Sequence, residues 1–184
     1  MKRLFILLIA VLTLSGCSGD TTDTALRVRQ QIYNSGGCTF TAVVTADYGD
    51  SLYEFEMECQ TDASGDLHFY VVSPQTIQGI TGYIRDKGGE LTFDDQVLAF
   101  ELLADGQITP VSAPWIVMRT LRSGYLNGVA DIDTGTMLTI DDSYDEGALK
   151  VNIWLDEKDL PVCAEIVYDG RRILSIQISG FAYV

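Results

Sequence analysis

The chain is poor in the residues that most often carry out chemistry. Its 184 residues include one histidine, four cysteines, and 12 lysines and arginines against 26 acidic residues. The single histidine, His68, cannot be combined into a Ser-His-Asp set or a Cys-His pair with a recognisable signature, and a zinc site needs more histidines or a close cysteine pair. The formal charge of −14 makes nucleic acid and bare anionic membrane poor partners. We therefore expect no catalytic residue, no metal, no cofactor and no enzyme activity.

Long apolar runs are also scarce, and the one near the N-terminus is too short to cross a membrane. It extends over the 11 residues from Leu4 to Leu14, after Lys2 and Arg3, whereas a spanning helix needs about 20 residues. This layout is typical of a secretory signal peptide. Residues 14–17, Leu-Ser-Gly-Cys, resemble the bacterial lipobox at every position, which implies cleavage before Cys17 and attachment of lipid, such as palmitate, to that residue.

Three segments follow from this interpretation. We expect a signal peptide over 1–16, a lipidated cysteine with a polar tether over 17–24, and one domain over 25–184. Cleavage leaves 10 basic residues against 26 acidic ones, a formal charge of −16. Membrane contact must therefore come from the lipid, and stable anchoring takes two or more acyl chains. The domain is then held close to the extracytoplasmic side of the cell membrane.

The sequence pattern predicts that the domain belongs to the α+β class. A short helix is expected with Thr22 or Asp23 as cap and with Ala25, Val28 and Ile32 on one face. A second begins at Ser112, with Pro114 in its first turn, and ends at Gly124. The strand-like segments, about eleven in all, share apolar alternation and turn-rich borders; they are 38–47, 51–60, 66–73, 78–86, 89–95, 96–102, 128–133, 136–142, 148–156, 161–170 and 171–184. One antiparallel sheet of this length, with interruptions expected at Gly79 and Gly82, will curl into an incomplete half-barrel.

The first hairpin carries a hypothesis about two cysteines. If Tyr48 and Gly49 form a two-residue turn, Cys38 lies opposite Cys59 on the apolar face. Such a pair could form a disulfide after export, or it could remain two small buried thiols; both alternatives stay open. The other face of this hairpin carries Glu54, Glu56 and Glu58 beside threonines, as a solvated sheet face does.

The last hairpin predicts a bulge. Its apolar residues share a face only if the loop holds an odd number of residues, which Tyr168, Asp169 and Gly170 supply. Cys163, beside Glu165 and opposite Trp154, has no partner in this arrangement.

Two acidic segments superficially resemble calcium loops. They are Asp131–Gly135 and Asp141–Gly147. Counted from Asp142, the twelfth position is Ile153, where a bidentate glutamate is required, so we interpret both segments as turns.

Several stretches together resemble a known superfamily. They are SPQTIQGITGYI, GELTFDD, APWIVMRTL and LPVCAEIVYDGRRILSIQISGF. The resemblance is to LolA/LolB-type lipoproteins, and more narrowly to the LolA-like lipoproteins of Gram-positive and spore-forming bacteria. It implies a strongly curved antiparallel sheet whose apolar concave face is covered by helices acting as a lid. In the transport members the cavity holds acyl chains, whereas in a spore-germination branch the fold serves as a partner of a cortex-processing amidase.

Two departures limit what this resemblance carries over. The periplasmic carrier is soluble, whereas Cys17 implies lipidation, and the first hairpin offers only glutamates where the carrier places an arginine. Five residues are candidates for lining an acyl-chain pocket, namely Phe40, Phe55, Met57, Trp115 and Met118; the alternative is that they are packed core. The leading hypothesis is a cell-envelope lipoprotein that binds a hydrophobic ligand, either a lipid or a lipoprotein acyl chain. The alternative is a non-catalytic adaptor or activator of a cell-envelope or spore-cortex enzyme. The oligomeric state stays open.

Overall fold

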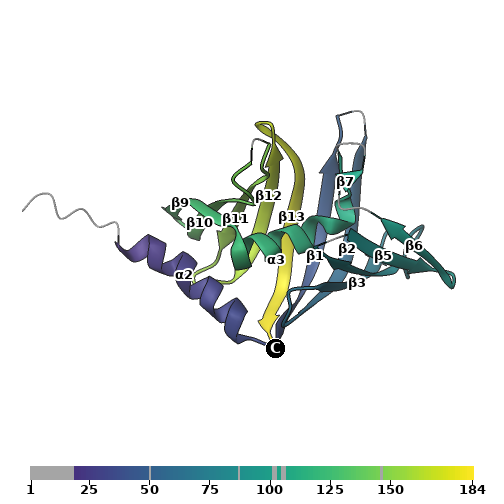
Figure 1. Cartoon of the computed structure of the whole chain (residues 1–184), viewed down its shortest axis with the longest axis horizontal. Coiled ribbons are helices and arrows are strands. Elements are labelled where there is room, and N and C mark those ends of the chain that lie inside the picture. Colours follow the sequence, from purple (N-terminus) through teal and green to yellow (C-terminus); the bar gives the residue numbers. More distant parts are fainter. Residues whose placement is uncertain (1–18, 50, 87, 101–102, 105–106, 146) are drawn as a thin grey trace, which may run out of the picture.

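The fold is dominated by one open antiparallel sheet. The structure, a computed structural model, describes residues 19–49, 51–86, 88–100, 103–104, 107–145 and 147–184. Within these residues the main sheet has 11 strands, and a separate two-stranded sheet pairs β7 with β8. The strand order is β6-β5-β4-β3-β2-β1-β13-β12-β11-β10-β9. The expected α+β class with a single antiparallel sheet that does not close into a barrel is confirmed (Figure 1).

The strands fall into two groups along the chain. The first group is β1 (Gly37–Asp47), β2 (Leu52–Asp62), β3 (Leu67–Ser73), β4 (Thr81–Arg85), β5 (Gly88–Phe93), β6 (Gln96–Phe100), β7 (Leu103–Ala104) and β8 (Gln107–Ile108). The second group is β9 (Tyr125–Ile132), β10 (Gly135–Asp141), β11 (Lys150–Leu155), β12 (Pro161–Tyr168) and β13 (Arg171–Tyr183). Strands β1–β6 and β9–β13 each form a meander. The two meanders join where β1 pairs with β13, the first strand with the last.

Two helices lie against one face of the sheet, which we call the concave face. Helix α2 spans Gly19–Asn34 and contacts α3, β9 and β10. Helix α3 spans Ala113–Ser123, after a short 3-10 turn η1 (Pro110–Ser112), and crosses the middle of the sheet (Figure 1). Its contacts include β1, β10, β11 and β13. The core lies between α3 and this face, because the alternate residues of β1 and β13 that point toward α3 are buried.

Helix α2 begins earlier than expected. It starts at Gly19 and not with a cap at Thr22 or Asp23, so residues 19–22 are helical. Val28 and Ile32 are buried, as the apolar periodicity predicts.

The start of α3 also differs in detail from its expected cap. Ser112 precedes the helix but makes no side-chain capping bond. Its hydroxyl instead donates to the carbonyl oxygen of Thr109 at 2.6 Å, within the preceding turn. The helix ends before Gly124 as expected.

The register of the first hairpin corrects a second expectation. Tyr48 N–H donates to the carbonyl oxygen of Ser51 at 3.1 Å, so Tyr48 is the last paired residue and not part of the two-residue turn. Gly49 has φ +88°, which suits the first position of the turn. Every pair is therefore shifted by two residues, and Cys38 lies opposite Thr61 while Cys59 lies opposite Phe40. The side-chain faces are as expected because a shift of two preserves them.

The last hairpin contains the expected bulge at a different place. The turn holds two residues, Asp169 and Gly170, with φ of 48° and 72°. Both values are positive, as in the hairpin turn that favours Asp-Gly. The register then shifts between Ile166 and Val167, so the odd residue that the pattern requires lies within the strands and not in the loop.

Gly82 does not interrupt the sheet as expected. It is a paired residue of β4, between Phe69 of β3 and Leu91 of β5. A methyl group there would meet the Phe69 ring at 2.2 Å, so glycine leaves room for that ring. Gly79, with φ +93°, does lie in the turn before β4.

Candidate functional site

The five residues expected to line a pocket meet in the core. Phe40, Phe55 and Met57 come from β1 and β2, and Trp115 and Met118 come from α3. All five are buried in one hydrophobic cluster between the sheet and this helix. Burial alone does not select between a packed core and a pocket that opens when a ligand enters, so their role as pocket residues stays a prediction.

A continuous apolar row crosses the concave face from this core to the edge of the sheet. Direct cross-strand pairing places these residues side by side over six strands, in the order Phe40, Cys59, Phe69, Gly82, Leu91, Leu98. The first three are buried, Gly82 and Leu91 are half-buried, and Leu98 is 61% exposed. The apolar surface therefore continues beyond the part of the sheet that α3 packs against.

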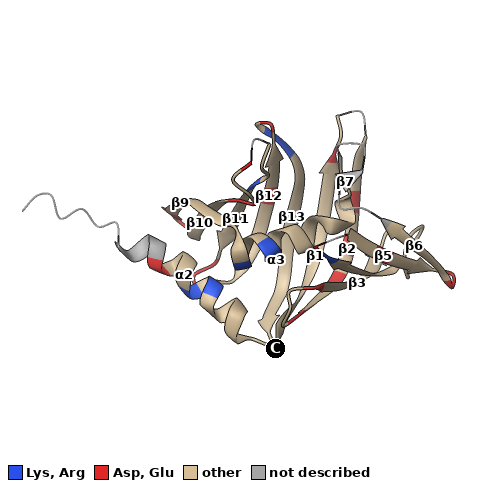
Figure 2. Ribbon diagram, in the orientation of Figure 1, with Lys and Arg blue, Asp and Glu red and all other residues tan. Residues whose placement is uncertain are grey.

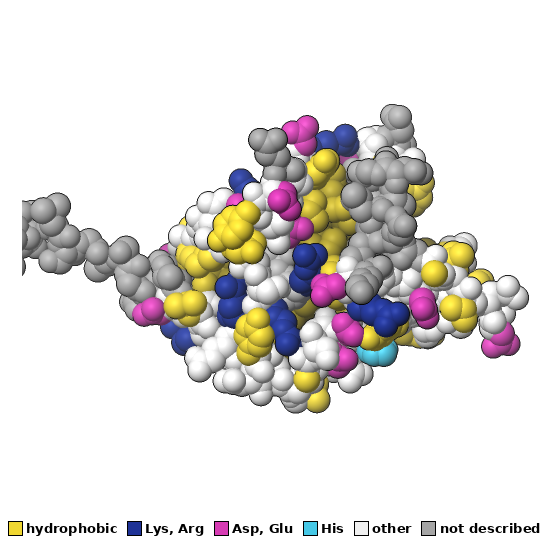
Figure 3. Space-filling model, viewed as in Figure 1, with side chains coloured by type: hydrophobic (Ala, Val, Ile, Leu, Met, Phe, Trp, Pro, Cys, Tyr) yellow, Lys and Arg dark blue, Asp and Glu magenta, His cyan; other side chains and the backbone are white. Residues whose placement is uncertain are grey.

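The exposed end of this row lies on the β5–β6 hairpin. Phe93, on the same face, is also exposed, and Val97 on the opposite face is 67% exposed. Figure 3 shows a hollow with hydrophobic side chains at its bottom over the middle of the molecule, away from this hairpin. The sequence of β6 carries the signal for the exposed end of the row, because apolar residues at both Val97 and Leu98 break the polar and apolar alternation of a half-solvated strand.

The helices that cover the core carry four of the chain's 12 lysines and arginines (Figure 2). Arg29 of α2 donates to the carbonyl oxygens of Leu121 and Gly124 at 3.0 and 2.7 Å, which satisfies the C-terminal end of α3. Arg119 of α3 lies over the Trp115 ring at 5.2 Å. The Arg29 bonds join the two helices to each other, whereas the contact of Arg119 with Trp115 lies within α3.

The two cysteines of the first hairpin are buried thiols and are not joined by a disulfide. Cys38 and Cys59 are both free, and the observed register removes the direct opposition on which the expected disulfide rested. They are diagonal neighbours, a separation of about 7–8 Å that a disulfide does not bridge without backbone movement. Burial raises the pKa of both thiols, so neither is an activated nucleophile.

Cys163 lies opposite Trp154, as the sequence predicts. Burial, followed by the neighbouring Glu165 carboxylate, raises the pKa of the Cys163 thiol. This thiol is therefore poorly suited to nucleophilic chemistry as well.

His68 and the acidic segments are the other residues that could carry catalytic or metal-binding chemistry. His68 is exposed on β3 and packs against the Tyr83 ring with 4.6 Å between ring centroids. The acidic segments form turns, and in one of them the Asp142 carboxylate accepts the Leu149 N–H at 2.7 Å. In the part of the chain that the structure describes, no group of three histidine, cysteine or acidic side chains could hold a metal ion.

The N-terminal features lie outside the described residues. Cys17 and the signal peptide expected over 1–16 are among them, so both remain predictions. Of the helices formed by the described residues, none has the length and hydropathy to cross a membrane.

Solved structures with a similar fold exist, although the sequences are very different. No protein-family model matches the sequence, and no curated protein matches it. Among solved structures, an outer membrane lipoprotein-sorting protein domain from Vibrio parahaemolyticus is 9% identical with a TM-score of 0.50, over 88% of this chain and 91% of that one. This likeness shows the fold alone, and it confirms the resemblance to LolA-like proteins at that level.

Two further structures are similar at slightly lower scores. A conserved protein from Thermus thermophilus is 12% identical with a TM-score of 0.49, over 88% of each chain. A LolA superfamily protein from Nitrosomonas europaea is 9% identical with a TM-score of 0.48, over 87% of this chain and 93% of that one.

Proposed function

We propose that the protein is a non-enzymatic lipoprotein that binds a hydrophobic ligand, a lipid or a lipoprotein acyl chain, on the concave face of its sheet. The observation that supports this most directly is the apolar row from Phe40 to Leu98, which leaves the core and becomes exposed on β6. The surfaces of soluble proteins usually carry scattered single apolar residues. A continuous apolar row that leads into the core is instead typical of a ligand-binding surface.

The arrangement of the helices suggests where such a ligand enters. Arg29 fixes the C-terminal end of α3 to α2, so this end of the cover is the harder to lift. The β5–β6 hairpin lies at the other side of the sheet and exposes Phe93 and Leu98. An acyl chain would therefore first contact this hairpin and then extend along the row toward Phe69.

The N-terminal sequence supports the location that we propose. A basic start, an apolar run and the Leu-Ser-Gly-Cys motif together indicate export, cleavage and lipidation at Cys17. The protein would then be anchored in the cell membrane by its acyl chains and face the extracytoplasmic side.

Two neighbouring residues of β6 provide a matched test. Leu98→Glu places a charge on the concave face, and Val97→Glu places the same charge on the opposite face at a similarly exposed position. Binding of dansyl-labelled undecanoic acid, followed by fluorescence, should weaken at least about tenfold in Leu98→Glu and stay unchanged in Val97→Glu, because a carboxylate is costly beside an acyl chain. Mass spectrometry of lipid copurified with the unmodified protein identifies the natural ligand.

The opposite pattern would count against the proposal. If both variants bind the probe as tightly as the unmodified protein does, the row on the concave face does not hold the probe. A drop in both would indicate damage to the hairpin itself, and thermal unfolding of each variant separates that case from a loss of binding.

The adaptor role is a second candidate, favoured by the edge of the sheet. Strand β6 is the last strand of the main sheet, and Val97 and Leu98 are both exposed on it. An edge strand of this kind can pair with a strand of another protein, here a cell-envelope or spore-cortex enzyme. A photo-crosslinking residue at Ala99 in living cells would capture one specific envelope protein if this is correct, and only lipid or nothing if it is not.

A further inference from the structure

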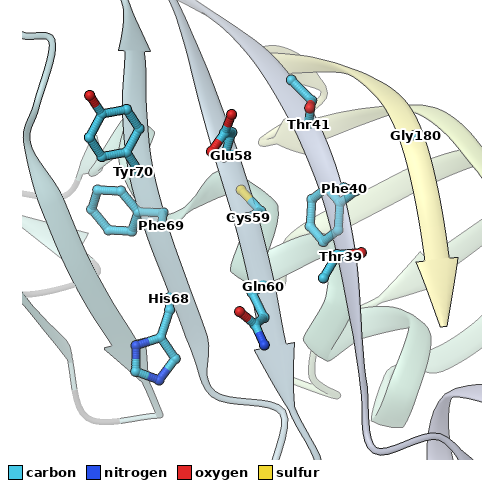
Figure 4. Close-up of a pocket in the computed structure, with 10 residues that line it drawn as sticks. All are labelled: Thr39, Phe40, Thr41, Glu58, Cys59, Gln60, His68, Phe69, Tyr70 and Gly180. Atoms are coloured by element: carbon cyan, nitrogen blue, oxygen red, sulfur yellow. The ribbon is translucent and has the colours of Figure 1, made fainter. Parts of the chain in front are cut away.

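The convex face, opposite to α3, carries a groove that the hydrophobic ligand would not use. It lies over β1, β2 and β3 and reaches β13 at Gly180. Its volume of about 490 Å³ is within the range of about 300–1,000 Å³ that small-ligand sites occupy. Figure 4 shows the side chains around it.

Two rows of side chains border this groove, and each row crosses three strands. In one row Thr41, Glu58 and Tyr70 are direct cross-strand neighbours. In the other row the neighbours are Thr39, Gln60 and His68. Because alternate residues of a strand share a face, all six point to the side away from the buried Phe40, Cys59 and Phe69.

The polar groups of these rows are free to bind a ligand. Among the described residues, the hydroxyls of Thr39 and Thr41, the Gln60 amide and the Glu58 carboxylate make no hydrogen bond or ion pair. Hydroxyls and amides both donate and accept, and the carboxylate accepts, so the groove presents mixed hydrogen-bonding capacity.

Gly180 keeps one end of the groove open. A bulge opposite Phe40 sends the ring of Phe181 to the concave side, where it stacks on Phe40 with 5.7 Å between centroids. Gly180, with φ +61°, remains at the groove, and a methyl group built on it would meet no atom within 4 Å. Among the described residues, no side chain therefore fills the sheet surface here and no helix covers it.

Aromatic rings form the other end. Tyr70 is 39% exposed, and His68 packs on Tyr83 of β4. The Tyr83 hydroxyl donates to the Asp66 carboxylate, which holds that ring in place. The groove therefore has aromatic rings at one end and two rows of polar side chains beside them, on a sheet face that is exposed to solvent.

The chemistry of the lining selects the class of ligand. Glu58 in the groove and Glu56 next to it along β2 disfavour phosphates and other anions. The polar border offers little to an acyl chain. A sugar ring fits both the aromatic end and the polar rows of the groove. Its C–H face packs on an aromatic ring, and its hydroxyls need partners that donate and accept hydrogen bonds. We propose that this groove binds a neutral oligosaccharide chain.

This site is independent of the proposed function. The same three strands would carry a hydrophobic ligand on one face and a glycan on the other, so both could be bound at once. Loss of one activity should leave the other intact, which separates failure of this inference from failure of the lipid-binding proposal.

The single histidine of the chain is a natural reporter. The full chain, prepared in detergent without a histidine tag, gives one set of imidazole proton NMR signals, from His68. Titration with cellotetraose and with the tetramer of N-acetylglucosamine should shift these signals in a saturable way for at least one of the two. The Tyr70→Ala and Gln60→Ala variants should bind at least about tenfold more weakly.

The matched control is Tyr125→Ala, since Tyr125 is also 39% exposed but lies on β9 at the far edge of the sheet. It should bind as the unmodified protein does. No shift with either oligosaccharide would overturn the proposal, as would equal binding by Tyr70→Ala. A shift with trilysine but with neither sugar would assign the groove to a cationic ligand and also overturn it.

Discussion

At the scale of single residues, two tyrosines with opposite hydrogen-bonding states make a sharp comparison. The Tyr48 hydroxyl donates to the carbonyl oxygen of Ile108 at 2.9 Å. The Tyr183 hydroxyl is buried and has no hydrogen-bond partner among the described residues. We expect Tyr48→Phe to lower the free energy of unfolding by about 0.5–1.5 kcal/mol, because a bond is lost and a carbonyl is left unpaired. Tyr183→Phe should leave it unchanged or raise it by up to about 1 kcal/mol, as urea unfolding at neutral pH can measure.

The same tyrosine predicts a pH dependence. Burial, followed by the nearby Cys38 and Asp159, raises the pKa of Tyr183 to about 12. A raised folded-state pKa means that its contribution to stability is fully present below the ordinary value of 10.0 and is lost as the pH rises toward about 12. Between these limits the unmodified protein should lose stability faster than Tyr183→Phe. Parallel curves for the two proteins would contradict the raised value, because they would mean that the pKa of this hydroxyl is the same in the folded and unfolded states.

At the scale of elements, the pairing of α2 with α3 depends on one arginine more than on the other. Arg29 makes two charge-assisted bonds to the last carbonyls of α3, whereas Arg27 makes an exposed ion pair with Asp159 at 2.9 Å. Arg29→Met keeps the apolar stem but should cost about 2–3 kcal/mol of stability. Arg27→Met should cost less than about 1 kcal/mol. Chemical unfolding of the two variants measures both, and equal losses would contradict a specific role for Arg29 at the end of the helix.

The hairpins show what a sequence pattern can and cannot predict. Alternation predicted the faces of β1 and β2 correctly, because a half-buried sheet tolerates only one parity. It could not choose between registers two residues apart, and the backbone of Gly49 decided that choice. The cysteine pairing failed for this reason. In the last hairpin the parity argument correctly required an odd residue, and Asp-Gly chemistry then placed it within the strands.

At the scale of the whole molecule, local patterns predicted the elements better than the site. The helices, nearly all the strands and the single open sheet follow from periodicity and turn residues. The pairing of β1 with β13, the exposed end of the apolar row and the convex groove depend on residues far apart in the chain. None of these has a local sequence signal strong enough to locate it, although the doubly apolar strand β6 indicates the exposed end.

The charge of the whole protein makes its membrane attachment testable. With a formal charge of −14, the chain as a whole should be repelled by an anionic bilayer, so the lipid that we propose at Cys17 would have to supply the attachment. In cells, the unmodified protein should sediment with membranes and stay there in high salt, because insertion of acyl chains is not screened. Cys17→Ser should move to the soluble fraction and should not bind phosphatidylglycerol vesicles. Retention of Cys17→Ser on vesicles at low salt, with release at high salt, would instead assign membrane contact to the arginines of α2 and α3, which lie together on one side of the molecule (Figure 2).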